Sequence, residues 1–224
     1  MNAPDQAAAV DAVSGADQRT AEWHADRAGK FTGSKFVALT ERNKTPGKKF
    51  GAKLASWDNL IWQVVTERMT GRQDEGADSF ALRWGREVEP AALEAYELAT
   101  GNIVTKSPFV NHPKYPFTGC SPDGLIGVTG GIEIKSPKDP TIHLRRFFDG
   151  MPDEIKPQVQ GSMWVEEREW WDFVSFHPHV PESHRLLRIR IHRDEEFIKF
   201  IEQSVLEAEA EACALLERLK RIAI

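Results

Sequence analysis

The stretch CSPDGLIGVTGGIEIKSP, residues 120–137, contains the clearest structural signal in the chain. Two apolar runs, within residues 117–128 and 131–135, flank a Thr-Gly pair, which is typical of two β-strands joined by a tight turn. The turn is expected near residues 128–130, and Asp123 lies five residues before Val128 while Glu133 lies five residues after it. Because residues of a hairpin pair symmetrically about its turn, we expect these two carboxylates to lie opposite each other.

Side chains on the second strand of this hairpin alternate between its two faces. Glu133 and Lys135 are two residues apart, so they share one face. Ile132 and Ile134 point to the other face and into a core. The pattern therefore predicts two carboxylates and one ammonium group converging beside a buried sheet.

Converging carboxylates repel each other and resist ionisation unless a cation neutralises them. A hard divalent ion does so through oxygen ligands and keeps waters available for substrate and nucleophile. A lysine beside such an ion can orient or deprotonate the attacking water and stabilise the charged transition state. These are the groups needed to hydrolyse a phosphodiester.

The competing interpretation of this hairpin is a surface turn with a solvated Glu–Lys pair. A second Glu-Ile-Lys triplet at residues 154–156 shows how easily such a pattern arises, since it has no strand around it and follows Pro152-Asp153 too closely for a hairpin. The apolar flanks of residues 120–137 favour the buried alternative, because they place the charges on a sheet that faces a core.

The composition is that of an ordinary soluble globular protein, with 224 residues, 41% hydrophobic and 28% charged. No apolar run reaches the roughly 18 residues of a membrane-spanning helix, and the N-terminus lacks a secretory signal, so we expect a cytoplasmic protein without a membrane partner. The two cysteines, Cys120 and Cys213, are too few for a disulfide scaffold or for a four-cysteine zinc or iron–sulfur site.

Charge is distributed unevenly along the chain. The net charge is −5, yet residues 19–53 are rich in Lys and Arg, whereas residues 74–100 and 193–224 are acidic. A local basic face can bind phosphates while the whole molecule stays acidic. Lys48 and Lys49, in the middle of this basic segment, are therefore candidate DNA-binding residues.

Periodicity and capping signals predict an α/β (mixed α+β) protein with a central mixed sheet flanked by helices. We expect residues 1–18 to be a disordered lead-in and residues 19–224 to form a single domain. Helices are expected at residues 19–28, 35–41 (capped by Thr32 or Ser34), 57–69 (capped by Ser56), 78–100 (kinked or divided at Pro90), 139–148, 153–167 and 194 to about 221 (capped by Asp194). Strands are expected at residues 102–106, 117–128, 131–135, 170–176 and 185–192.

Several ordered blocks resemble the lambda exonuclease type (YqaJ-like) of phage recombination nucleases, within the PD-(D/E)xK restriction-endonuclease-like superfamily. They cover about residues 20–200 in the family's order. The blocks are WHxxRxGxxTxS at 23–34, GKK at 47–49, LRWG at 82–85 with Glu89, CSPDGL at 120–125, ExKxP at 133–137 and QVQxSMWV at 158–165. Any one block would be weak evidence for the resemblance, but the whole set in this order is specific.

The resemblance implies a restriction-endonuclease-like fold and a Mg²⁺-dependent 5′→3′ exonuclease acting on double-stranded DNA ends. Two Mg²⁺ ions are expected, with Mn²⁺ able to replace them. Members of the family commonly form ring-shaped homotrimers, act with a single-strand annealing protein in phage-type recombination, and work in the bacterial host cytoplasm.

The resemblance also implies roles for individual residues. Asp123, Glu133 and the backbone carbonyl of Ile134 match metal ligands, and Lys135 matches the water-activating residue. The remaining matches are Glu89 for the acidic residue near a second metal, Gln158 for the helix glutamine that closes the site, and Arg27, Thr32, Ser34 and Ser121 for a 5′-phosphate pocket.

Two positions depart from the family pattern: Pro113 stands where one relative has an aspartate, and Ile155 where an aromatic residue is usual. They concern local substrate contacts and leave the metal ligands intact. Two alternatives remain. One is another PD-(D/E)xK nuclease, such as a restriction-type endonuclease, and the other is a DNA-end-binding module without catalysis. The intact set of Asp123, Glu133 and Lys135 argues against the second.

Overall fold

The computed structural model describes residues 18–44, 51–73 and 79–222. The proposed lead-in, apart from Gln18, and the two candidate DNA-binding lysines, Lys48 and Lys49, lie outside the described residues. Among the described residues, no helix combines the length and apolar character needed to cross a membrane.

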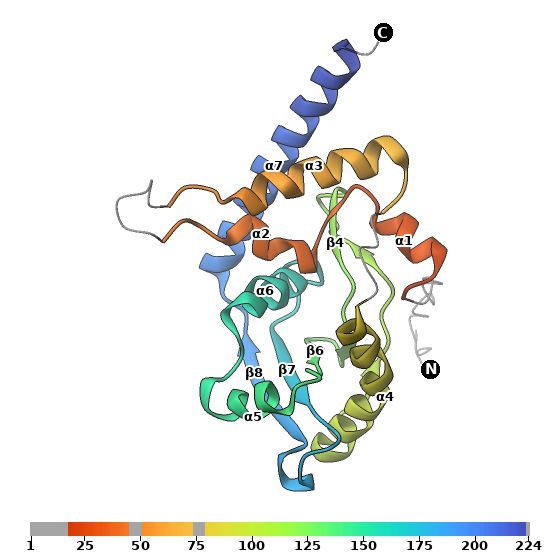
Figure 1. Ribbon diagram of the computed structural model, residues 1–224, viewed down its shortest axis with the longest axis vertical. Helices are drawn as coiled ribbons and strands as arrows, with labels where there is room; N and C mark the ends of the chain where they lie inside the picture. The colour runs from red at the N-terminus through yellow and green to blue at the C-terminus, as the bar shows by residue number, and fades with distance from the viewer. Residues whose placement is uncertain (1–17, 45–50, 74–78, 223–224) are drawn as a thin grey trace, which may run out of the picture.

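A five-stranded mixed sheet forms the centre of the molecule, in the order β2-β5-β6-β7-β8 (Figure 1). Only the β6–β7 pair is parallel, because α5 and α6 carry the chain back to the start of the next strand. Its strands are β2 (Val104–Thr105), β5 (Gly124–Ile126), β6 (Gly130–Lys135), β7 (Trp170–Phe176) and β8 (Leu186–His192). A smaller sheet, β1-β4-β3, consists of β1 (Phe31–Thr32), β4 (Thr118–Cys120) and β3 (Val110–Asn111). The predicted fold class is confirmed.

Helices cover both faces of the large sheet (Figure 1). They are α1 (Ala21–Arg27), α2 (Phe36–Thr40), α3 (Ala55–Thr70), α4 (Phe80–Thr100), α5 (Pro140–Asp149), α6 (Lys156–Val165) and α7 (Glu195–Ile222), with short 3-10 turns η1 (Gly33–Lys35), η2 (Asp153–Ile155) and η3 (Glu182–His184). Helix α4 packs Val88 and Tyr96 against Ile132 and Ile134, and α6 packs Met163 against the opposite face. The other side of α6 joins a second core with α2, α3 and α7.

The hairpin follows the predicted register. Gly124 pairs with Ile132 and Ile126 with Gly130, so Asp123 and Glu133 are the next positions along the same ladder. The single strand expected at residues 117–128 is wrong, because the chain leaves β4 after Cys120 and enters β5 of the other sheet at Gly124. Proline has no N–H to give to a strand ladder, and Pro122 stands at this break.

Three of the expected helix details are wrong. Of the two outcomes expected at Pro90, a kink or a division, the division is wrong, because α4 is one continuous helix and Val88 and Ala92 on either side of Pro90 pack into the same core. Ser56 does not cap α3, since the cap position is Leu54. Neither Thr32 nor Ser34 caps the following helix; the Thr32 hydroxyl instead accepts a hydrogen bond from Arg27. Asp194 caps α7 as expected, accepting from the Phe197 N–H at 3.0 Å.

A close approach between α6 and α2 depends on Gly161. A Cβ at this position would lie 2.1 Å from the ring of Phe36, a fully buried residue. Gly161→Ala is therefore expected to lower the free energy of unfolding by about 1–3 kcal/mol, as overpacking does. Gly85→Ala in α4 is the control, since its Cβ would meet no atom within 4 Å, and stability should stay unchanged or rise by up to about 1 kcal/mol. Urea titrations of both variants test this, and equal destabilisation would contradict it.

His143 of α5 is fully buried, and its ring bonds the Ser175 hydroxyl at 2.8 Å and the His184 carbonyl at 2.7 Å. Burial lowers the pKa of His143, and the neighbouring His177 and Arg146 act in the same direction. The unfolded chain, whose histidine titrates near about 6.5, then binds more protons than the native state as the pH falls through that value. Stability should fall between about pH 7 and pH 5, and His143→Gln should reduce this pH dependence. Denaturation at several pH values, with the exposed His179→Gln as control, measures it.

Candidate active site

The hairpin brings Asp123 and Glu133 to one end of the large sheet. Asp123 lies on the connection between β4 and β5, and its Oδ2 accepts a hydrogen bond from the Ile134 N–H at 2.6 Å. This bond fixes the carboxylate against β6, beside the backbone of Ile134. The structure thus places together the two carboxylates and the backbone group that the family resemblance implies as metal ligands.

Glu133 is 1% exposed and is held by two donors. Lys135 Nζ and Gln158 Nε2 both donate to its Oε1, at 2.6 and 2.7 Å. Its other oxygen, Oε2, is buried without a hydrogen-bond partner. A buried, unpaired carboxylate oxygen is costly, so this atom is suited to hold a ligand that comes from outside the protein.

Burial and the charges of neighbouring side chains shift the pKa values of Asp123 and Lys135. Burial raises the pKa of Asp123 well above its ordinary value, and the charges of Glu133 and Glu89 add to this shift. Burial lowers the pKa of Lys135, but Glu133 and Asp123 more than offset it, so its pKa lies above the ordinary value. Lys135 is therefore an ammonium group at neutral pH, suited to orienting water and to stabilising negative charge.

The donor chemistry fits a hard divalent cation. Asp123, Glu133 and the Ile134 carbonyl offer oxygen atoms, which Mg²⁺ prefers, and the unpaired Oε2 of Glu133 is one of them. Within the described residues, no group of three or more His, Cys, Asp or Glu side chains is arranged around one metal position. Water would have to complete the coordination, as it usually does for Mg²⁺.

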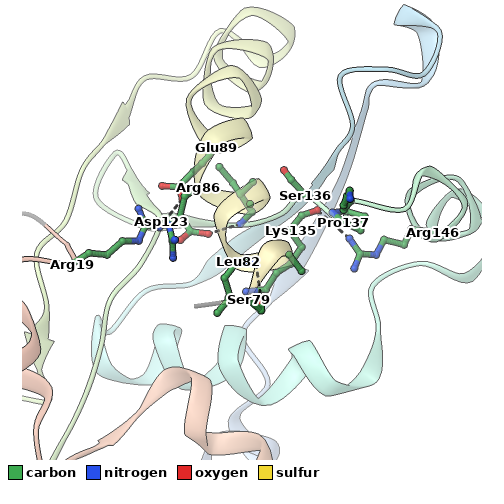
Figure 2. A pocket seen from close by; sticks show the side chains of 14 residues that line it. Arg19, Ser79, Leu82, Arg86, Glu89, Asp123, Lys135, Ser136, Pro137 and Arg146 are labelled. Atoms are coloured by element: carbon green, nitrogen blue, oxygen red, sulfur yellow. Dashed lines mark hydrogen bonds and ion pairs between the residues drawn. The ribbon is translucent and has the colours of Figure 1, made fainter. Parts of the chain in front are cut away.

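A cavity of about 430 Å³ opens beside these residues (Figure 2), and we call it the acidic cavity after its two carboxylates, Asp123 and Glu89, although cationic side chains also line it. Asp123 and Lys135 line one part of it, and Glu89 of α4 lines another. Glu89 Oε2 forms an ion pair with Arg19 Nη2 at 2.9 Å. The predicted second-metal residue thus shares the cavity with the metal-ligand candidates, and its carboxylate is paired with an arginine.

A second cavity, of about 140 Å³, lies next to Arg27, and we call it the Arg27 cavity. Ser34 and Ser121 also line it. Arg27 is 8% exposed; its Nη1 donates to Ser121 Oγ at 2.9 Å and its Nη2 to Thr32 Oγ1 at 3.2 Å. The guanidinium also lies 4.2 Å from the ring centroid of Trp23. The structure therefore brings together the four residues predicted to form a phosphate pocket.

Burial lowers the pKa of Arg27 to about 10, so this guanidinium remains charged at neutral pH. Its two hydrogen-bond partners, Ser121 and Thr32, are neutral hydroxyls, and its Nε is buried without a partner. A buried cation held by neutral groups gains strongly from an anion, above all from one that accepts several hydrogen bonds. The Arg27 cavity is thus a candidate anion site.

Gln158 connects the two cavities. It lines the Arg27 cavity and at the same time donates to Glu133 beside the acidic cavity. Thr32, by contrast, is fully buried beneath Arg27 and acts by positioning it.

Sequence reasoning missed three residues at this site. Arg19 lines both cavities, Trp23 donates from its indole N–H to Ser121 Oγ at 3.0 Å, and Arg146 donates to the Lys135 carbonyl at 3.1 Å. Trp23 belongs to the WHxxR block, which could have indicated it. Arg19 and Arg146 belong to no such block, and most arginines are simply solvated.

A sequence model of the YqaJ-like viral recombinase domain matches residues 22–169. The chain belongs to this family. Among solved structures, the YqaJ-like fold is matched by an alkaline exonuclease from Laribacter hongkongensis, with 37% identity, a TM-score of 0.80, and coverage of 90% of this chain and 97% of that one. The complex of that enzyme with dAMP gives a TM-score of 0.81 at 36% identity, with the same coverage.

A phage related exonuclease from Haemophilus somnus 129PT shares the fold at 18% identity, with a TM-score of 0.65 and coverage of 85% and 96% of the two chains. No curated protein sequence matches the chain. The family and the two structures of the Laribacter enzyme support a nuclease or recombinase function for this YqaJ-like chain.

Proposed function

We propose that the protein is a Mg²⁺-dependent 5′→3′ exonuclease that removes mononucleotides from one strand of linear double-stranded DNA. Phage-type homologous recombination by single-strand annealing would use the strand that remains. The observation that carries this proposal is the adjacency of the acidic cavity and the Arg27 cavity. One is suited to a metal and a phosphodiester, and the other to a terminal phosphate.

The connection between β4 and β5 links the two cavities directly. Ser121, at its start, bonds Arg27, and Asp123, two residues later, lines the acidic cavity. A 5′-terminal phosphate bound at Arg27 would therefore leave the next phosphate of the same strand near Asp123 and Glu133. This spacing supports the release of one nucleotide per cut.

In the proposed reaction, the oxygen of a water forms a bond to the scissile phosphorus, and the bond to the 3′-oxygen of the departing nucleotide breaks. Lys135 orients the water and stabilises the developing negative charge, while Gln158 holds Glu133 in place. Divalent ions held by Asp123, Glu133 and the Ile134 carbonyl, with Glu89 near a second one, would neutralise charge and make the water acidic. The leaving 3′-oxygen takes a proton, and the shortened strand ends in a new 5′-phosphate, which can enter the Arg27 cavity.

An assay on linear and covalently closed circular duplexes tests the function. With Mg²⁺, linear DNA carrying 5′-phosphates should yield mononucleotides, and EDTA should stop the reaction. Closed circles should stay intact, because they offer no end. Cleavage of closed circles would instead indicate an endonuclease, and binding of ends without cleavage in Mg²⁺ or Mn²⁺ would indicate an end-binding module.

The family resemblance also supports a ring-shaped homotrimer, an annealing-protein partner and action in the bacterial cytoplasm, and we retain these as parts of the proposal. A ring would keep an acidic protein on DNA by topology more than by affinity. Light scattering across the working concentration range tests the trimer. A monomer would remove this account and would predict distributive digestion.

A further inference from the structure

Arg19 lies where the acidic cavity and the Arg27 cavity meet. It lines both of them. Figure 2 shows its side chain extending from the N-terminal segment toward Glu89 and Asp123. A cation in this place faces the path that a DNA strand must take if its terminal phosphate is at Arg27 and its next phosphate is at Asp123.

The backbone around Arg19 is held firmly. Gln18 Nε2 donates to the Pro122 carbonyl at 2.6 Å, which ties the segment to the connection that carries Asp123. On the other side, the Thr20 hydroxyl caps α1 by accepting from the Trp23 N–H at 3.2 Å. Arg19 itself has φ of +74°, a left-handed conformation that costs a non-glycine residue free energy. The local structure therefore holds the backbone of Arg19, and with it the base of the side chain, in a defined position.

The side chain itself is free to exchange its partner. The side chains of Arg19 and Glu89 are 45% and 26% exposed, and ion pairs open to solvent contribute little stability, typically below about 1 kcal/mol. The two non-bridging oxygens of a phosphodiester offer a guanidinium the same paired-oxygen geometry as a carboxylate. Exchanging the Glu89 carboxylate for a phosphate therefore costs little free energy and leaves the Arg19 guanidinium paired with an anion.

We propose that Arg19 binds the scissile phosphodiester and that Glu89 is its counter-ion while no DNA is present. The proposal rests on the exonuclease function proposed above and adds a third phosphate-directed group to Arg27 and Lys135. When the strand enters, Arg19 moves from Glu89 to the phosphate. Glu89 is then released inside the acidic cavity as an oxygen donor.

The salt dependence of DNA binding tests this contact directly. Each protein–phosphate contact contributes about 0.9 to the slope of log K against log salt on duplex DNA. Ca²⁺ is present to permit binding without turnover. Arg19→Gln should weaken binding of a 5′-phosphorylated duplex about tenfold, and it should reduce the magnitude of the salt slope by about 0.9, the contribution of one phosphate contact. Arg19→Lys should retain the slope. Arg218→Gln, an exposed arginine on α7, is the control and should change neither quantity.

A double-mutant cycle in EDTA tests the role of Glu89. Glu89→Gln should tighten DNA binding, because Arg19 is no longer held by a carboxylate, and adding Arg19→Gln should remove that gain. An unchanged salt slope in Arg19→Gln, or an equal gain from Glu89→Gln in both backgrounds, would overturn the proposal. Failure of the wild type to digest phosphorylated linear ends would instead overturn the proposed function.

Discussion

Replacing Glu133 by glutamine or alanine is expected to lower the rate of DNA cleavage by at least about a thousandfold, or roughly 4 kcal/mol in the activation free energy. Glu133 is a buried carboxylate beside the acidic cavity, and its Oε1 accepts a 2.6 Å hydrogen bond from Lys135. Asp123→Ala and Lys135→Ala should have effects of similar size. The first removes a proposed metal ligand, and the second removes the ammonium group that orients water.

DNA binding should survive these substitutions, because most of the affinity comes from phosphate contacts elsewhere. Ca²⁺ should support binding but little cleavage, since it coordinates loosely and activates water poorly. Cleavage rates and binding constants measured on the same linear duplex separate the two effects. Near-normal cleavage by Glu133→Gln would exclude the proposed mechanism.

The chain supplies a matched control for this experiment. Glu154 belongs to the second Glu-Ile-Lys triplet, which lies at the junction of η2 and α6 and not on a strand. Its side chain is exposed. Glu154→Ala should therefore leave cleavage unchanged, although it alters the same three-residue pattern as Glu133→Ala.

The acidic hairpin could be predicted from the sequence because every signal for it is local. A glycine-containing turn, alternating side chains and apolar flanks together fix the register, and the register places Asp123 opposite Glu133. The strands Trp170–Phe176 and Leu186–His192 were predictable for the same reason, since each is long enough to show a pattern.

The Arg27 cavity could not be derived in this way, because its parts come from distant segments. Helix α1 supplies Arg27, η1 supplies Ser34, and the connection after β4 supplies Ser121. Strands β1 and β3, which align these segments, have two residues each and show no periodicity. Only the family resemblance grouped these residues. Arg19 matched no block, and its position depends on hydrogen bonds of Gln18 across the fold.

Arg27→Ala is expected to slow digestion of 5′-phosphorylated ends by about tenfold or more, equivalent to about 1.4 kcal/mol or above. A terminal phosphate carries more negative charge than an internal phosphodiester, with about −1.5 to −2 at neutral pH. The buried guanidinium, with neutral hydroxyls as hydrogen-bond partners, is suited to that extra charge. A 5′-hydroxyl end offers no such group, so its digestion should change little.

Digestion rates on matched linear duplexes that differ only in the 5′ group test this prediction. The hydroxyl substrate is an internal control for damage to the fold. Ser34→Ala is a milder second variant: it removes an exposed hydroxyl that lines the cavity and leaves the bonds of Arg27 to Ser121 and Thr32 in place. It should reduce the preference for phosphorylated ends less than Arg27→Ala does. If the wild type digests both ends at equal rates, the Arg27 cavity does not bind the terminal phosphate, and Arg27 is a structural residue that joins α1 to the connection carrying Ser121.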